Sequence, residues 1–407
     1  MMDNSQKSHL FQASSGSPEQ NVRKAIDMMG GIQSIVSQDD IVIVKPNAQW
    51  EGHAITNTDT LKGLIDLILE QGNFGGEIII AENHHFHPDD SRGWTAIKRN
   101  GRFNLNELIE YYRANGHKNV TKCHWRDAGK CRYPIHGDAR AGRLLESPEE
   151  GDGYIWGSDD YSYKHLKTKM NYPVFTSSYS GKRIDFKHGI LENGKFIPQC
   201  VKFINISALN HHGNTGITAS IKNYMGVVDM TCGFHGEEPE GYYNFHYVGF
   251  DWPNISIVRR ALQGAMRSQT LRRMKQINRL ITFIGPVNGA TGGAIGRFMK
   301  KVRMADVHIV AAEYVGHESR WKNPIQVRKV IASFDPVALD YYGAKYIMLP
   351  LGGIHAHKHD PDDPKTSLRR FLDLCCREGI GTLDERRMVI HQHDFNTDRQ
   401  ETYHLAS

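Results

Sequence analysis

Residues 210–223 hold two histidines, two threonines and a lysine within fourteen positions, directly after an apolar run that is typical of a buried strand. A histidine can accept or donate a proton near neutral pH, and a desolvated lysine can bind an anion or act as a nucleophile. We therefore predict that His211, His212 and Lys222 are catalytic. Asn223, next to the lysine, is predicted to bind substrate. The alternative is a polar loop that leads into a helix.

A lysine and an asparagine follow a second short apolar run, residues 41–44. Lys45 lies shortly before the predicted start of a helix, where free backbone amides favour anions. We expect a substrate-binding group at this point, made of Lys45, Asn47, Thr56 and Thr58. In the alternative interpretation, the lysine only binds neighbouring carbonyl groups.

Two histidine-rich loops could bind a metal. The first offers one carboxylate and three imidazoles, which are ligand types for divalent metals; its residues are Glu82, His84, His85 and His87. A solvated loop is the alternative. The second loop, residues 355–360, is either a metal site or a mobile lid, and a surface loop is the preferred interpretation.

The elements that must position these residues follow from apolar periodicity. Apolar runs at 41–44 and 78–81 flank a helical pattern over 58–69, and this order predicts a right-handed crossover between parallel strands. Ligands in such sheets bind beyond the carboxyl ends of the strands. We therefore predict an α/β fold with parallel sheets flanked by helices, in two lobes with the site between them. Further strands are predicted at 280–284 and 307–312, and further helices at 255–277, 337–348 and 367–378.

The chain is predicted to form one α/β domain over residues 20–390, with tails at 1–19 and 391–407. An insertion over residues 86–200, rich in aromatic and polar side chains, interrupts the domain and contains one helix near 105–114. Aromatic side chains suit an apolar ligand pocket, so we expect a lid or cap. An oligomer interface is the alternative.

Composition excludes several classes of protein. No run of 18 apolar residues exists and the N-terminal residues lack the apolar segment of a signal peptide, so we expect a cytoplasmic protein without a membrane partner. The net charge of +5 owes much to a basic stretch over 259–279, which has no interleaved aromatic residues, and we predict no nucleic-acid partner. The six cysteines form no CxxC pair, so no iron–sulfur cluster is expected. A homo-oligomer is left open.

The clusters described above, in this order, resemble the domain of unknown function 362 family. The resemblance covers about residues 22–389 apart from 86–200, and it implies the fold and the location of the site. The matching pieces are Ile43-Val44-Lys45-Pro46-Asn47, the helix over 58–69, the block His212…Thr218…Ile221-Lys222-Asn223…Gly226, Gly285-Pro286…Gly289, residues 333–340 and residues 372–381.

The segment from His211 to Gly226 also looks like the histidine–glycine–lysine segment of lactate racemases, and residues 56–64 look like their threonine-rich substrate loop. In that family the lysine anchors a nickel-pincer nucleotide and the histidines move protons. The resemblance implies corresponding roles for Lys222 and for His211 with His212.

Together these features predict an enzyme that acts on a small anionic substrate, a carboxylate, and moves a proton or a hydride beside the carboxylate. The class would be isomerase- or racemase-like, or an oxidoreductase. The cofactor is undetermined, with a divalent metal as one option. One alternative is a metal-dependent oxidoreductase or lyase in which histidines from 84–87, 211–212 and 317 meet at one ion. Another is a binding or scaffold protein without turnover.

Overall fold

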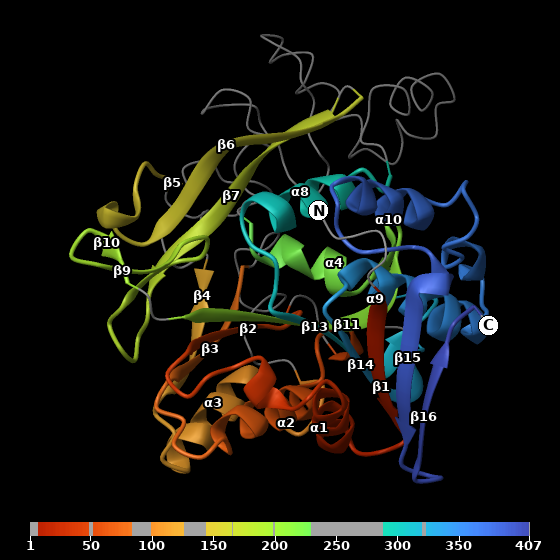
Figure 1. Cartoon of the computed structure of the whole chain (residues 1–407), viewed down its shortest axis with the longest axis horizontal. Helices are drawn as coiled ribbons and strands as arrows, with labels where there is room; N and C mark the ends of the chain where they lie inside the picture. The colour runs from red at the N-terminus through yellow and green to blue at the C-terminus, as the bar shows by residue number, and fades with distance from the viewer. Residues whose placement is uncertain are drawn as a thin grey trace.

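The computed structural model describes residues 7–48, 52–83, 99–125, 144–164, 166–197, 200–228, 288–319 and 323–406. Its centre is a ten-stranded sheet in the order β16-β15-β1-β14-β13-β11-β2-β3-β4, with β12 paired to β11 (Figure 1). The strands are β1 (Ser8–Ser14), β2 (Ile41–Lys45), β3 (Glu77–Glu82), β4 (Val120–His124), β11 (Val201–His212), β12 (Gly216–Thr218), β13 (Val307–Gly316), β14 (Ile325–Ser333), β15 (Met388–Asp394) and β16 (Arg399–His404).

The strands β4, β3, β2, β11 and β13 run parallel to one another, as the strand–helix–strand pattern predicts. The carboxyl ends of these five strands therefore lie at one edge of the sheet. Beyond β13, the strand β14 runs antiparallel to both of its neighbours, β13 and β1. The prediction of an α/β fold with a mostly parallel sheet is confirmed, and the two-lobe arrangement stays a prediction.

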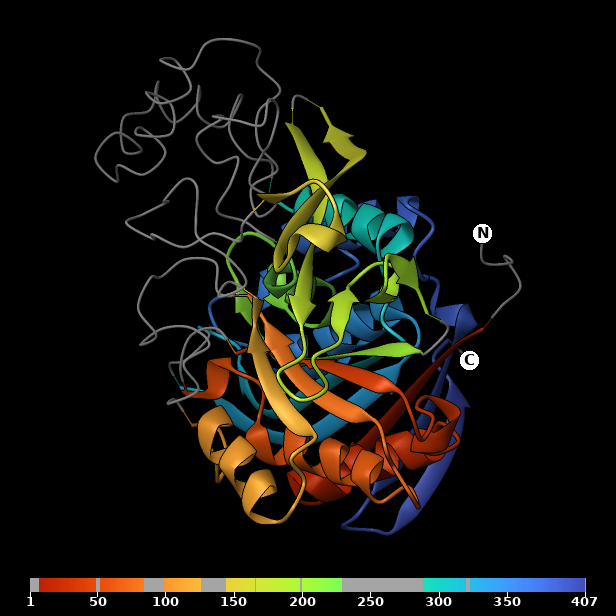
Figure 2. The ribbon, with the colours of Figure 1, turned by 90° about the vertical axis from the view of Figure 1, so that its left-hand side faces the viewer.

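Both faces of the sheet are covered by helices (Figures 1 and 2). Successive side chains of a strand point to opposite faces, so Ile41 and Ile43 join one apolar cluster while Val42 and Val44 join the other. The cluster around Val42 and Val44 includes α1 (Pro18–Met28), α2 (Thr58–Leu69) and α3 (Leu105–Ala114). The opposite cluster includes α4 (Ser220–Asn223), α8 (Thr291–Lys301), α9 (Pro336–Tyr342) and α10 (Ser367–Arg377).

Several helix starts among the described residues are fixed by N-cap side chains that accept backbone N–H groups. The predicted helix over 58–69 is α2, and its N-cap is Asn57, whose side chain accepts from the amides of Asp59 and Thr60. The helix expected at 367–378 is α10, capped by Thr366. The helix expected at 337–348 divides into α9 and a π-helical segment, Gly343–Met348. The strand at 280–284 and the helix at 255–277 lie outside the described residues.

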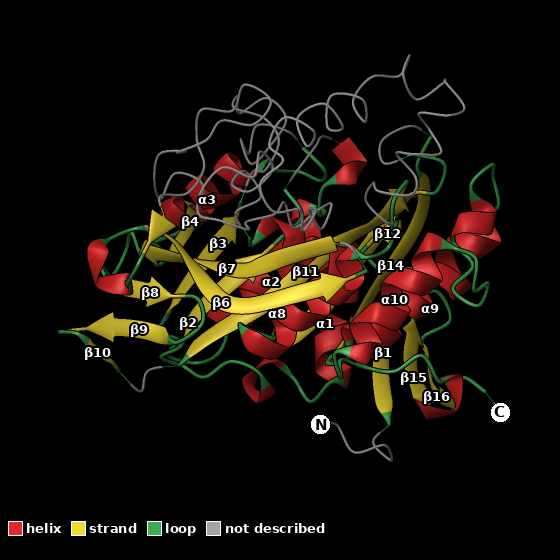
Figure 3. Cartoon of the chain, turned by 90° about the horizontal axis from the view of Figure 1, so that it is seen from above, coloured by secondary structure: helices red, strands yellow, loops and turns green. Residues whose placement is uncertain are grey.

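A second sheet of six strands packs above the first on the side of α8 (Figure 3). Its order is β10-β9-β8-β7-β6-β5. Tyr161 of this sheet lies so close to α8 that a Cβ atom at Gly293 would come within 1.9 Å of its hydroxyl. The strands are β5 (Leu144–Leu145), β6 (Gly153–Tyr163), β7 (Leu166–Thr176), β8 (Arg183–Asp185), β9 (Gly189–Glu192) and β10 (Lys195–Phe196).

Several elements that we expected in an insertion or in the tails belong to the main part of the fold. The helix expected near 105–114 is α3, and the strand after it, β4, pairs with β3, so these elements extend the main sheet. Residues 8–14 and 388–404, assigned largely to tails, form β1, β15 and β16 of that sheet. Their pairing joins the two ends of the chain, and a local apolar pattern carries no information about such a distant partner.

None of the helices in the described ranges has the length and apolar character needed to span a bilayer.

Candidate functional site

Three of the predicted site residues meet in a buried cluster at the carboxyl ends of β2 and β3. The Nζ atom of Lys45 donates to Glu82 Oε1 at 3.0 Å and to Asn223 Oδ1 at 2.9 Å. A third bond, of 2.9 Å, goes to the carbonyl oxygen of Pro46. Three acceptors match the three N–H donors of an ammonium group. Every donor of Lys45 is thus directed at the protein, which agrees with the interpretation in which this lysine binds neighbouring groups.

Burial and charge pairing oppose each other at this ion pair. Burial lowers the pKa of Lys45 and raises the pKa of Glu82, while the attraction between the two groups counteracts both shifts. The second carboxylate oxygen of Glu82 accepts the backbone N–H of Ala48. Because both of its oxygens are engaged, Glu82 ties the loop after β2 to the end of β3.

The buried cluster continues across the sheet along one row of the strands. The register aligns Asn205 of β11 with Lys45 of β2 and with His308 of β13. Asn223 Nδ2 donates to Asn205 Oδ1 at 2.7 Å, and His308 Nδ1 lies 2.8 Å from the hydroxyl oxygen of Ser220. Burial lowers the pKa of His308 to about 3, so its ring is neutral at physiological pH. These contacts join Ser220 and Asn223 of α4 to β11 and β13, and they hold the helix on the sheet.

Asp340 holds the start of α4, the helix that carries Lys222. Its two carboxylate oxygens accept the backbone N–H groups of Ser220 at 2.8 Å and Ile221 at 2.9 Å. Burial raises the pKa of Asp340 to about 8, and the two amide donors oppose that shift. Lys222 itself is buried, with 6% of its surface exposed.

The remaining predicted substrate ligands take part in backbone contacts near the start of α2. The hydroxyl of Thr56 accepts the N–H of Asn47 at 2.8 Å and donates to the carbonyl of Ile206 at 3.0 Å. The hydroxyl of Thr58 lies within hydrogen-bond distance of the carbonyls of Asn100 and Phe103. These contacts position the loop between β2 and α2 against β11.

A histidine cluster lies at the end of β11. The ring of His211 stacks on that of His355, with centroids 4.2 Å apart and planes 8° from parallel. Its Nδ1 atom lies 2.9 Å from Nε2 of His359. The loop over 355–360 is therefore packed on β11, and His359 has no exposed surface. His357 in the same loop is exposed, so the loop lies at the surface, as expected, with one side packed on β11.

The protonation of the histidine pair is constrained by its surroundings. Burial, together with the proximity of His211, His355 and His317, lowers the pKa of His359 to about 3. A hydrogen bond between two imidazole nitrogens needs one N–H and one lone pair, so the tautomers of His211 and His359 are coupled. A proton gained or lost by one ring therefore changes the state of the other.

His212 has a different role from its neighbour. Its Nδ1 atom accepts the backbone N–H groups of Asn214 at 3.1 Å and Thr215 at 3.4 Å. A nitrogen that accepts two N–H groups carries no proton itself. The ring of His212 thus stabilises the turn between β11 and β12.

A basic pocket of about 360 Å³ opens beside this turn. It is bordered by Gly213 on one side and by the start of α10 on the other. Its charged or hydroxyl-bearing lining residues include Lys358, Lys365, Ser367 and Arg370. The segments that form the histidine cluster, after β11 and around 355–359, thus also form walls of this pocket.

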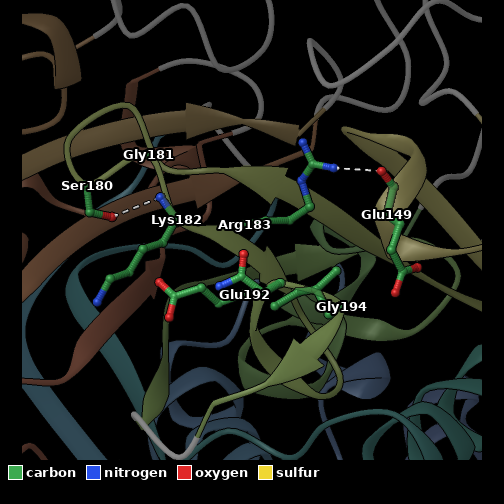
Figure 4. A pocket seen from close by; sticks show the side chains of 9 residues that line it. Glu149, Ser180, Gly181, Lys182, Arg183, Glu192 and Gly194 are labelled. Atoms are coloured by element: carbon green, nitrogen blue, oxygen red, sulfur yellow. Dashed lines mark hydrogen bonds between the residues drawn. The ribbon is translucent and has the colours of Figure 1, made fainter.

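A second pocket, of about 440 Å³, lies on the six-stranded sheet, away from all of the predicted residues (Figure 4). Its acidic and basic side chains are mixed: Glu149 and Glu192 face the same space as Lys182 and Arg183. Arg183 donates to the carbonyl of Glu149 at 3.1 Å. Because its charges are balanced and it is lined by turns, we assign no reaction to this pocket.

The metal hypothesis is tested only in part. His84, His85 and His87 lie outside the described residues. Within the described ranges, no group of three or more histidine, cysteine, aspartate or glutamate side chains is arranged to hold a metal ion.

The sequence analysis missed the cations of the basic pocket. Lys358 and Lys365 lie on either side of a loop with two Asp-Pro steps, and Arg370 lies in the first turn of α10. One signal was present, since Thr366 and Ser367 mark a helix start and two of the pocket cations, Lys365 and Arg370, lie within five residues of that start. The sequence does not show that Gly213 and the start of that helix border the same pocket.

The fold and the site define an α/β protein with a polar site beyond the carboxyl ends of its parallel strands, where such sheets bind ligands. Residues 175–345 match the family model described as Domain of unknown function (DUF362), which confirms the predicted family over this segment. The matched residues include β11, α4, β13 and α9, and therefore His211, Lys222 and Asp340. Comparison with curated proteins and with solved structures gave no match.

Proposed function

We propose that the protein is an enzyme that moves a proton at the carbon beside the carboxylate of a small anionic substrate. One observation carries the proposal: the end of β11 with the turn after it, and the residues around 355–359, form both the His211–His359 pair and part of the basic pocket. A proton-transfer group and an anion site are the two parts that such a reaction needs.

In this proposal His211 accepts and returns the proton, and His359 positions it. A neutral His359 ring at 2.9 Å from His211 Nδ1 supports this assignment, because it fixes the tautomer and orientation of the His211 ring. His355 stacks on the other side of that ring and limits its rotation. A catalytic base held in one rotamer is better prepared to react than a mobile one.

The anion is assigned to the cations of the pocket in place of Lys45, whose donors are engaged within the protein. Lys222 remains the proposed anchor for a cofactor or for the substrate, as the resemblance to the lysine of lactate racemases implies. Lys45, Glu82 and Asn223 then act as positioning residues that hold α4, and with it Lys222, at the strand ends.

The reaction needs no oxidant. The C–H bond beside the carboxylate breaks, the proton moves to His211, and the electron pair is delocalised onto the carboxylate oxygens, where cations stabilise the charge. A proton then returns to the same carbon from either face. The net result is an isomerisation or racemisation.

Solvent exchange tests the proposal. Purified protein is incubated in D2O with a panel of small carboxylates, and proton NMR follows loss of the signal from the carbon beside the carboxylate. We expect exchange with at least one member of the panel in the wild-type protein. Exchange should persist in His404→Asn, a variant of an exposed histidine in β16. No exchange across a broad panel would count against proton transfer.

A further inference from the structure

The basic pocket has more positive charge than a single carboxylate requires. Lys358, Lys365 and Arg370 line it together with one acidic residue, Asp363, whose carboxylate accepts the backbone N–H of Lys365 at 2.9 Å. With His357 neutral, the lining carries a net charge of +2, from three cations and one anion. A dianion would balance this charge.

No ion pair with a carboxylate in the described ranges involves the three cations of the pocket. Neither Lys358 nor Lys365 forms an ion pair with any residue in the described ranges. Arg370 is oriented by a hydrogen bond of 2.8 Å from one guanidinium nitrogen to the carbonyl of Asn288. A guanidinium fixed through one nitrogen keeps its other donors for an oxyanion.

The first turn of α10 adds neutral donors to the same space. The hydroxyl of Thr366 caps the helix by accepting the N–H of Arg369 at 3.0 Å. Ser367, the first residue of the helix, lines the pocket and has a hydroxyl and a backbone N–H with no acceptor among the described residues. Amides at a helix start are suited to oxyanions.

A close backbone contact fixes Ser367 beside Gly289. A Cβ atom at Gly289, where φ is +87°, would lie 2.5 Å from the carbonyl oxygen of Ser367, so only glycine permits this approach. Gly213 forms the opposite border of the pocket and has no atom within 4 Å of its would-be Cβ. The start of α10 is therefore held in place by a tight contact, whereas the backbone at Gly213 has free space beside it among the described residues.

We infer that this pocket binds a phosphoryl group, which belongs to a phosphorylated carboxylate substrate whose reacting carbon extends toward His211. Three cations, a serine hydroxyl and the backbone N–H of the same serine match a tetrahedral dianion with several acceptor oxygens. A volume of about 360 Å³ exceeds that of the phosphoryl group alone and leaves room for a small organic part. Identification of the bound molecule as substrate rests on the proposed function, whereas the phosphoryl site itself does not.

Titration calorimetry of the full chain tests the inference with four probes: inorganic phosphate, acetate, glycerate and 3-phosphoglycerate. We expect phosphate to bind at least tenfold more tightly than acetate, and 3-phosphoglycerate to bind at least tenfold more tightly than glycerate, as an added set of charge-assisted contacts predicts. Binding of phosphate should weaken as ionic strength rises.

Variants locate the site. Lys358→Gln/Lys365→Gln should weaken phosphate binding by about tenfold or more. Lys118→Gln/Lys195→Gln, at two exposed lysines outside the pocket, makes the same change of charge and should leave phosphate binding unchanged. Melting curves of all variants check that the fold is retained.

Equal affinity for glycerate and 3-phosphoglycerate, or unchanged phosphate affinity in Lys358→Gln/Lys365→Gln, would overturn the inference. Binding of phosphate without binding of 3-phosphoglycerate would overturn the assignment of the phosphoryl group to a substrate. Calorimetry involves no turnover, so these outcomes are independent of the solvent-exchange result that decides the proposed function.

Discussion

At the scale of single residues, the ion pair of Lys45 and Glu82 is fully removed from water and each partner depends on the other. Lys45→Met should lower the free energy of unfolding by about 3–5 kcal/mol, since it leaves the Glu82 carboxylate buried without its cation. Denaturant unfolding measures the change. The double variant Lys45→Met/Glu82→Leu should recover much of the loss, because no unpaired charge remains.

The matched control for this variant is Lys24→Met. Lys24 forms an exposed ion pair with Asp27 at 3.4 Å. Its loss should change the free energy of unfolding by no more than about 1 kcal/mol. Equal effects at Lys45 and Lys24 would contradict the structural role of the buried pair.

Two buried histidines should make the protein sensitive to acid. Burial lowers the pKa of His308 and of His359 to about 3, whereas both titrate near 6.5 in the unfolded chain. The unfolded state therefore binds more protons below pH 6.5. The stability that the neutral rings provide is complete above pH 6.5 and is lost as the pH falls toward 3, by about 1.4 kcal/mol per pH unit for each ring.

The variant His359→Gln isolates one of these contributions. Between pH 6 and pH 4, the slope of unfolding free energy against pH should decrease by about 1.4 kcal/mol per unit relative to the wild-type protein. The exposed His404→Gln should keep the wild-type slope. An unchanged slope in His359→Gln would mean that this ring titrates normally in the folded protein.

At the scale of elements, α4 and the turn after it lie unusually close to the ends of β2 and β3. A Cβ atom at Gly226 would lie 2.4 Å from Glu82 Oε1 and 2.7 Å from Lys45 Nζ. Gly226→Ala should therefore destabilise the protein by about 1–3 kcal/mol, because the buried pair must shift. Gly213→Ala should have no such cost, since its Cβ would meet nothing within 4 Å. Thermal unfolding of the two variants compares them, and equal stability would disprove the close approach.

Much of the element structure could be predicted from the sequence. The continuous apolar run of residues 41–44 and the helical repeat of 58–69 are local signals, and they predicted β2 and α2. The pairing of β1 with β15 was not predictable, because it joins Ser8 to Met388 and neither strand has a long apolar run. Local propensity identifies an element more readily than its distant partner.

The site was predictable to a similar extent. The rule for parallel strand ends placed Lys45 and Glu82 near one another, and the structure joins them by a direct bond. The bond from Lys45 to Asn223, in α4, was not part of that prediction. Which group binds substrate depends on which donors are already engaged, and the sequence does not show that. The pairing of His211 with His359, like the pocket beyond it, depends on how a distant loop packs on β11.

At the scale of the whole molecule, the two sheets share one apolar core. The ring of Phe186, from the six-stranded sheet, lies 4.9 Å from that of Phe203 in β11 and 5.6 Å from that of Trp125, which follows β4. Phe186→Ala should cost about 3–5 kcal/mol. Because the core is continuous, unfolding followed by far-UV and by near-UV circular dichroism should give coincident transitions in the wild type and in the variant. Separate transitions would show that the two sheets unfold independently.

The central claim is that His211 transfers a proton at the strand ends, and the exchange rate in the His211→Asn variant tests it most directly. With a carboxylate that exchanges in the wild-type protein, the rate of deuterium incorporation should fall by about 10²- to 10⁴-fold in this variant. The measurement requires that both proteins have matching melting temperatures. An exchange rate in His211→Asn equal to that of the wild type would contradict the assignment of proton transfer to this residue.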